Sequence, residues 1–123
     1  MPEPKIYTLD DANALLPHVA PALVELREKY EEAVKIRARV AQLASVNGHS
    51  LERDDWNRTL ARVAALFERI EEWQIELRDI STGLIDFPTV IEGEEAFLCW
   101  RLGEPQVAYW HPPDTGLAGR QPL

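Results

Sequence analysis

Several features are scarce or missing in this 123-residue sequence, and each narrows the possible functions. Cys99 is the only cysteine, so an internal disulfide is excluded and a reducing compartment is favoured. Lys and Arg total 13 against 21 Asp and Glu, and the net charge of -8 argues against general nucleic-acid or anionic-membrane binding. No apolar run approaches a membrane span, and the start Met1-Pro2-Glu3-Pro4 does not resemble a signal peptide. We therefore expect a cytoplasmic protein with neither nucleic-acid nor membrane partners.

The common catalytic and metal-binding motifs are missing as well. The sequence has no His-Glu-x-x-His, Cys-x-x-Cys or Glu-x-x-His pattern and no Gly-x-Ser-x-Gly nucleophile elbow. The segment Gly116-Leu117-Ala118-Gly119-Arg120 lacks the spacing of a phosphate-binding loop. No reaction, cofactor or metal can therefore be named from a motif.

The composition that is present predicts one globular domain over residues 1–123, built from two regions. Hydrophobic residues make up 46% of the chain and charged residues 28%, which is ordinary for such a domain. Residues 8–81 have helical periodicity. Residues 82–123 hold five of the six glycines, five of the nine prolines and half of the aromatic residues, so we expect strands, turns and any functional site there.

The helical region begins with a capping signal. Thr8 precedes two acidic residues, as expected of a helix N-cap, and predicts a short helix over residues 9–16. Pro17 and Pro21 are expected at the start of a second, longer helix, because proline is tolerated in a first turn but not deeper. That helix should run to about Ala44, with Val46-Asn47-Gly48 as its stop signal.

A second long helix is predicted from residues 51–55 to about Ile80. Its apolar residues follow a heptad that is interrupted only at Gln74. These apolar residues are Trp56, Leu60, Val63, Phe67, Ile70 and Leu77. Ser81-Thr82-Gly83 should end the helix, and two long helices joined by a short polar loop predict an antiparallel hairpin with a packed apolar seam.

After Gly83 the periodicity changes to that of strands. Three strands are predicted over residues 84–91, 95–102 and 106–111. Glu92-Gly93-Glu94 and Gly103-Glu104-Pro105 supply the turns between them. The expected fold class is therefore α+β: a long antiparallel helical hairpin with a short leading helix, followed by a three-stranded antiparallel meander.

Both faces of the predicted sheet carry large apolar groups. In the second strand Phe97, Cys99 and Arg101 share one face, and Leu98, Trp100 and Leu102 share the other. We expect the helical hairpin to cover one face and to bury Trp100. The other face must be covered either by the C-terminal tail or by a second subunit.

The charge distribution along the hairpin suggests a homodimer. Residues 33–65, near the loop, hold six basic and three acidic side chains, while residues 18–32 and 66–81 together hold four basic and nine acidic ones. The hairpin is thus expected to place Arg62 among basic residues and Glu25 among acidic ones. A second hairpin laid antiparallel would turn these repulsions into attractions. The alternative is a solvated face without a partner.

The polar residues of the last third suggest a ligand site. Arg101, His111 and Arg120 could line one positive pocket for a small anion, with Glu104 and Asp114 orienting them. In the alternative interpretation, Arg101 and Arg120 each pair with a carboxylate and anchor the tail. The preferred function is a non-enzymatic homodimeric module that binds a protein partner or a small anionic ligand through this region.

A metal-binding protein or small enzyme is the second hypothesis. It would use His111 and Asp114 together with Asp86 or Glu104, since carboxylates often orient an imidazole that acts as a ligand or base. In the alternative interpretation, which the sequence favours, His111 is structural and hydrogen-bonds to buried partners. Cys99, between Leu98 and Trp100, is interpreted as a small buried hydrophobic residue rather than a nucleophile.

Five motifs, in order, resemble a known family. They are Tyr7-Thr8-Leu9-Asp10-Asp11-Ala12-Asn13-Ala14-Leu15-Leu16-Pro17, Thr82-Gly83-Leu84-Ile85-Asp86-Phe87-Pro88, Leu98-Cys99-Trp100-Arg101-Leu102-Gly103-Glu104, Tyr109-Trp110-His111 and Gly116-Leu117-Ala118-Gly119-Arg120. Together they resemble the 2203 domain-of-unknown-function family of small uncharacterised bacterial proteins, over nearly the whole chain. The resemblance implies no activity, but it implies that the motifs of the last third are shared in detail.

Overall fold

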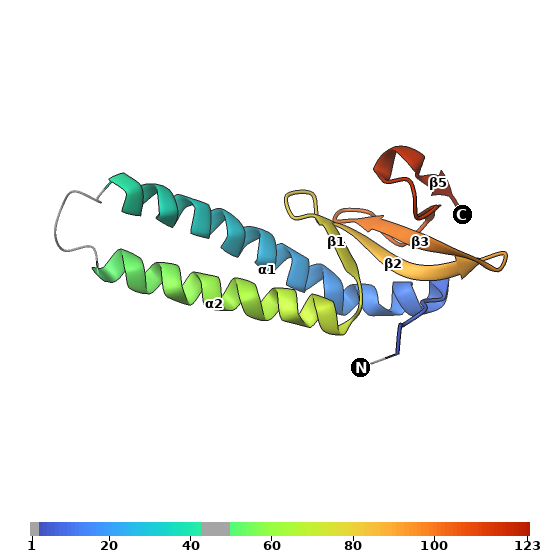
Figure 1. The fold of residues 1–123 in the computed structure, drawn as a ribbon, viewed down its shortest axis with the longest axis horizontal. Coiled ribbons are helices and arrows are strands. Elements are labelled where there is room, and N and C mark those ends of the chain that lie inside the picture. Colours follow the sequence, from blue (N-terminus) through green and yellow to red (C-terminus); the bar gives the residue numbers. More distant parts are fainter. Residues whose placement is uncertain (1–2, 43–49) are drawn as a thin grey trace.

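The computed structural model describes residues 3–42 and 50–123, which form two helices followed by one antiparallel sheet (Figure 1). Helix α1 spans Leu9–Gln42 and helix α2 spans Ser50–Glu72; they lie side by side and run in opposite directions. The expected stop signal at residues 46–48 lies outside the described residues. Within the described ranges, neither helix combines the length and apolar character that crossing a membrane requires. The α+β class agrees with the sequence analysis.

Thr8 caps α1 as predicted. Its hydroxyl accepts a hydrogen bond from the backbone N–H of Asp11 at 3.1 Å, and the Asp11 carboxylate accepts one from the N–H of Thr8 at 3.2 Å. This reciprocal pair satisfies two N–H groups that a helix start leaves without partners.

The predicted break at Pro17 is wrong, because α1 continues through Pro17 and Pro21 as one helix of 34 residues. Both prolines are exposed, so the carbonyls that they deprive of a partner can bond to water. On the opposite side the apolar residues keep helical spacing without interruption: Ala12, Leu16, Val19, Leu23 and Leu26 are all buried. We attribute the intact helix to this continuous packing face, which outweighs the local cost of proline.

The second helix is shorter than predicted and ends at Glu72. Gln74 adopts a left-handed backbone conformation with φ of 57°, and its N–H donates to the Glu71 carbonyl at 2.9 Å. The N–H of Ile75 donates to the Ile70 carbonyl at 3.4 Å, which completes a Schellman motif. The interruption of the heptad at Gln74 therefore marks the end of the helix.

The register of the hairpin also differs from the charge prediction. Arg62 on α2 pairs with Glu25 on α1, with Nε 2.5 Å from the carboxylate. The sequence analysis predicted that Arg62 lies among basic residues and Glu25 among acidic ones. In the structure each of these two side chains has the other, of opposite charge, as its partner. Both groups are exposed to solvent, so the pair contributes little to stability.

The sheet has five strands in the order β1-β2-β3-β4-β5, not three. The strands are β1 Glu76–Asp79, β2 Leu84–Ile91, β3 Glu94–Arg101, β4 Tyr109–His111 and β5 Gln121–Pro122. The third strand, predicted over residues 106–111, is shorter in the structure and spans only Tyr109–His111. β1 had been assigned to the helix, and β5 is too short to produce any hydrophobic alternation. The turn between β2 and β3 is at Glu92 and Gly93, as predicted.

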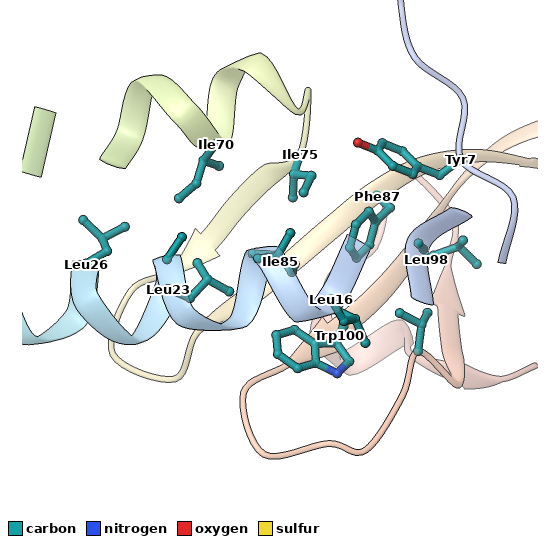
Figure 2. Packing of buried hydrophobic residues seen from close by; sticks show 14 of the residues in the cluster. Tyr7, Leu16, Leu23, Leu26, Ile70, Ile75, Ile85, Phe87, Leu98 and Trp100 are labelled. Carbon is teal, nitrogen blue, oxygen red and sulfur yellow. The ribbon is translucent and has the colours of Figure 1, made fainter. Parts of the chain in front are cut away.

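The inner face of the sheet packs against α1 and forms the main core (Figure 2). Ile85 and Phe87 of β2 lie beside Leu98 and Trp100 of β3, and all four are buried. Trp100 is 3% exposed and its indole N–H donates to the Glu104 carbonyl at 3.1 Å. The expected burial of Trp100 is confirmed.

The C-terminal tail covers the outer face, opposite α1 (Figure 1). The short 3-10 helix Leu117–Gly119 and the residues before it lie over Asp86, Cys99 and His111. The N–H of Leu123 donates to the Ala108 carbonyl at 2.9 Å and helps to hold the end of the tail in place. The chain therefore covers its own sheet.

Gly83 should be the least replaceable glycine of the turns. Its φ is +66°, and an added Cβ would lie 2.5 Å from Cγ of Leu102. We expect Gly83→Ala to lower the free energy of unfolding by about 2–4 kcal/mol, from backbone strain and overpacking together. Gly93 is the matched control, because its φ is +80° but the space around it is open. Gly93→Ala should cost only about 1–2 kcal/mol, and equal losses in urea unfolding would refute the steric argument.

Candidate functional site

Strand alternation brings three polar or reactive side chains together on the outer face of the sheet. Asp86 on β2 is directly opposite Cys99 on β3, and Cys99 is opposite Tyr109 on β4. His111 follows Tyr109 by two residues and therefore points to the same face. All three of Asp86, Cys99 and His111 are buried.

Asp86 and His111 form the most deeply buried contact between a carboxylate and an imidazole among the described residues, with each side chain 2% exposed. Nε2 of His111 lies 2.8 Å from Oδ2 of Asp86, and Nδ1 lies 2.8 Å from the Pro112 carbonyl. Because a carbonyl can only accept, Nδ1 carries a hydrogen and donates it to Pro112. Nε2 is then the nitrogen that shares a proton with Asp86 or offers its lone pair to another ligand.

Arg78 of β1 completes the environment of Asp86. Its Nε donates to Oδ2 of Asp86 at 2.8 Å, and its guanidinium also pairs with Glu76. Oδ2 therefore lies 2.8 Å both from Nε of Arg78 and from Nε2 of His111. Oδ1 of Asp86 is buried and has no hydrogen-bond partner among the residues that the structure describes. A buried carboxylate oxygen without a partner is costly, and a water molecule or an ion is the kind of group that satisfies it.

Cys99 is not an activated nucleophile. Burial raises the pKa of its thiol to about 11, and the nearby Asp86 carboxylate raises it further against the smaller opposing effect of Arg120. The thiol is therefore protonated at neutral pH, which agrees with the sequence interpretation of a buried, unreactive cysteine. A metal ion is the kind of partner that would deprotonate it.

Asp86, Cys99 and His111 place one donor atom each within 4.8 Å of one another. They adjoin a cavity of about 160 Å³ between the sheet and the tail. Its remaining walls come from Arg78, Leu84, Pro113, Thr115, Gly116 and Leu117. The group can hold a metal ion, with the cavity available for a further ligand.

A separate contact pairs Arg120 with Glu104. The two side chains are only 12% and 17% exposed, and Arg120 also donates to the Cys99 carbonyl at 3.4 Å. The guanidinium lies 4.1 Å from the centre of the Tyr109 ring, and Glu104 accepts the Arg101 N–H at 2.8 Å. This arrangement fastens the tail to the turn after β3.

The residues that the sequence analysis proposed for one site do not converge. Some of them lie in two separate buried contacts, and the others lie at the surface. Glu104 and Arg120 are together, and His111 lies against Asp86 rather than Asp114. The side chains of Arg101 and Asp114 are exposed, and neither has an ion pair among the described residues. Sequence reasoning missed Arg78 altogether and did not count Cys99 as a ligand. The two-residue turn at Glu92 and Gly93 could have placed Cys99 opposite Asp86.

With the fold and site in place, comparison with known proteins assigns the chain to a family. The family model described as "Uncharacterized conserved protein (DUF2203)" matches residues 5–123. The chain belongs to the DUF2203 family. The resemblance inferred from the five motifs is therefore confirmed. Searches of curated proteins and of solved structures found no match. The DUF2203 assignment covers both the helices and the outer face of the sheet, and it brings no activity with it.

Arg120 and Arg101 should respond differently to the same substitution. Arg120→Gln leaves the Glu104 carboxylate largely buried without its cation, and we expect it to lower the free energy of unfolding by about 2 kcal/mol. Arg101→Gln is the control, because its side chain is exposed; its effect should stay within about 0.5 kcal/mol. Thermal and urea unfolding of both variants measures this difference. Equal losses would show that the tail is not fastened by Arg120.

Proposed function

We propose that the protein binds one transition-metal ion of the zinc type through Asp86, Cys99 and His111. The observation that carries this proposal is the convergence of three chemically different donors beside a small cavity. It is the metal-binding hypothesis of the sequence analysis with a changed ligand set: Cys99 joins His111 and Asp86, and Asp114 and Glu104 are left out.

The donor types select the kind of metal. A thiolate and an imidazole suit zinc and similar transition metals, whereas magnesium and calcium prefer sites made of oxygen ligands alone. Three protein ligands with a fourth position for water or another small ligand is the composition of catalytic zinc sites. The cavity beside the three donors offers room for that fourth ligand.

The donor atoms already lie close together. Bond lengths in tetrahedral zinc sites imply donor atoms roughly 3.3–3.7 Å apart. One donor atom from each residue lies within 4.8 Å of the others, and the 2.8 Å contact between Nε2 of His111 and Oδ2 of Asp86 would give way to the ion. Oδ1 of Asp86 is the oxygen that lacks a partner among the described residues, so it can bind the ion while Oδ2 keeps its bond to Arg78.

The surrounding residues support such a site. The bond from Nδ1 of His111 to the Pro112 carbonyl fixes the ring with Nε2 as the ligand atom; metal-bound histidines commonly donate their other ring N–H to such an acceptor. Charge balances as well, since a divalent ion offsets one thiolate and one carboxylate. Of the two nearby cations, Arg78 also pairs with Glu76, and Arg120 pairs with Glu104.

Zinc titration of the untagged, chelator-treated protein tests the proposal. Calorimetry should give one zinc ion per chain, and magnesium in the same titration should give no binding. Failure to bind zinc at protein concentrations of tens of micromolar would refute the proposal.

A homodimeric binding module is the second candidate. It is favoured by the large apolar side chains that remain exposed on the hairpin, among them Tyr30, Val34 and Leu60. Sedimentation at micromolar concentration should give twice the chain mass of 14.0 kDa if the proposal holds. Anion binding by Arg101, His111 and Arg120 has less support, because Arg120 is paired with Glu104.

A further inference from the structure

A large groove runs between the hairpin and the turn after β1, and it shares Arg78 with the lining of the metal-site cavity. The volume of the groove is about 710 Å³. Five of its eleven lining residues are apolar, and the other six are charged or polar. The apolar ones are Tyr30 and Val34 of α1, Phe67 of α2, Leu77 of β1, and Ile80 after it. A groove of this size with a partly apolar lining is typical of a binding surface.

The apolar surface continues outward along the hairpin. Tyr30 and Val34, four residues apart on one side of α1, are 46% and 55% exposed. On α2, Leu60 lies seven residues before the groove residue Phe67, two turns farther out on the same stripe, and is 40% exposed. The sheet lies against the other end of the hairpin and leaves this outer part uncovered (Figure 1).

Charge changes sign along the same hairpin. The outer part, residues 33–42 and 53–61, holds five basic and two acidic side chains. The inner part, residues 18–32 and 62–72, holds seven acidic and four basic ones, even with Arg62 counted there as the partner of Glu25. Two parallel hairpins would place like charges together, whereas two antiparallel hairpins would place opposite charges together.

We infer that the groove is occupied by the outer hairpin of a second copy of this chain, in an antiparallel two-fold dimer. The inference rests on the proposed homodimer and specifies its surface. Leu60 and its neighbours from one copy would enter the groove of the other copy, and the reverse contact would fill the second groove. Such an isologous contact uses one patch twice and closes, so no unpaired groove remains to propagate a filament.

Two matched substitutions test the surface by sedimentation. Val34→Lys places a charge in the apolar contact and should weaken the dimer by at least about tenfold. Val90→Lys is the control, because Val90 is 47% exposed on β2 and lies outside the groove. The dissociation constant of the dimer should be the same in this variant as in the wild type. Circular dichroism checks that both variants are folded.

Charge reversal tests the antiparallel arrangement. On the apolar stripes, Arg37 and Arg53 lie in the basic outer part, while Glu31 and Glu71 lie in the acidic inner part. Arg37→Glu with Arg53→Glu, or Glu31→Arg with Glu71→Arg, should each weaken the dimer by about tenfold at low salt. All four changes in one chain should restore wild-type association to within about threefold, because opposite charges again meet.

The possible failures are distinguishable. A wild-type monomer at micromolar concentration would overturn the homodimer proposal and this surface together. A wild-type dimer that Val34→Lys does not weaken would leave the homodimer standing and overturn the surface. A dimer that tolerates either charge reversal alone, or that the combined reversal does not restore, would overturn the antiparallel arrangement.

Discussion

Trp100→Ala is expected to lower the free energy of unfolding by about 3–5 kcal/mol. The indole is 3% exposed and lies between β3 and α1 (Figure 2). Truncation would leave a cavity beneath the sheet and would also remove the donor to the Glu104 carbonyl. Because that carbonyl belongs to the turn that fastens Arg120, the loss should extend to the tail.

Urea unfolding measures this effect, and Trp100→Phe separates its two components. Phenylalanine retains much of the apolar contact but cannot donate, so it should cost less than alanine, about 1–3 kcal/mol. A loss below about 1 kcal/mol for Trp100→Ala is the level of an ordinary surface change. That result would contradict the position assigned to the inner face of the sheet.

Removing a metal ligand should have the second large effect. Loss of a residue that only hydrogen-bonds to a metal ligand reduces metal affinity by roughly 10- to 100-fold. Cys99 and His111 are proposed to bind the ion themselves, so we expect Cys99→Ser and His111→Ala each to reduce zinc affinity by more than that. Zinc at about 100 times its dissociation constant should stabilise the wild-type protein by about 2.7 kcal/mol, and should not stabilise these variants.

Two further variants make the metal prediction specific. Arg78→Gln removes the donor that holds Oδ2 of Asp86, so the carboxylate is less well oriented and zinc binding should weaken by about tenfold. Asp114→Asn removes a residue that the sequence suggested as a ligand but that lies exposed at the surface. Zinc affinity should be unchanged in Asp114→Asn; a large loss there would favour the original ligand set over the one proposed.

The sequence analysis predicted correctly those features that depend on residues close together in the chain. The Thr8 cap and the Glu92–Gly93 turn depend on residues a few positions apart, and both were predicted. The continuity of α1 through Pro17 depends instead on packing against the sheet, which local propensity does not contain. The end of α2 was signalled by Gln74, but a non-glycine residue at that position is an uncommon stop.

The candidate site was predictable only in part. Once the turn at Gly93 fixes the register of β2 against β3, Asp86 must lie opposite Cys99, so that contact could have been derived from sequence alone. Arg78 could not have been found, because it lies on a strand that had been assigned to the helix. The pairing of Arg120 with Glu104 requires the tail to fold back over the sheet, and sequence reasoning could raise this only as an alternative.

Cobalt(II) spectroscopy of the untagged protein tests the metal site most directly. Cobalt can replace zinc, and its spectrum reports both the ligand atoms and the coordination geometry. We predict an intense sulfur-to-cobalt charge-transfer band and visible bands of tetrahedral strength, saturating at one equivalent; the charge-transfer band should disappear in Cys99→Ser. Weak octahedral bands without a sulfur band, or a spectrum that Cys99→Ser leaves unchanged, would contradict a metal site formed by Asp86, Cys99 and His111.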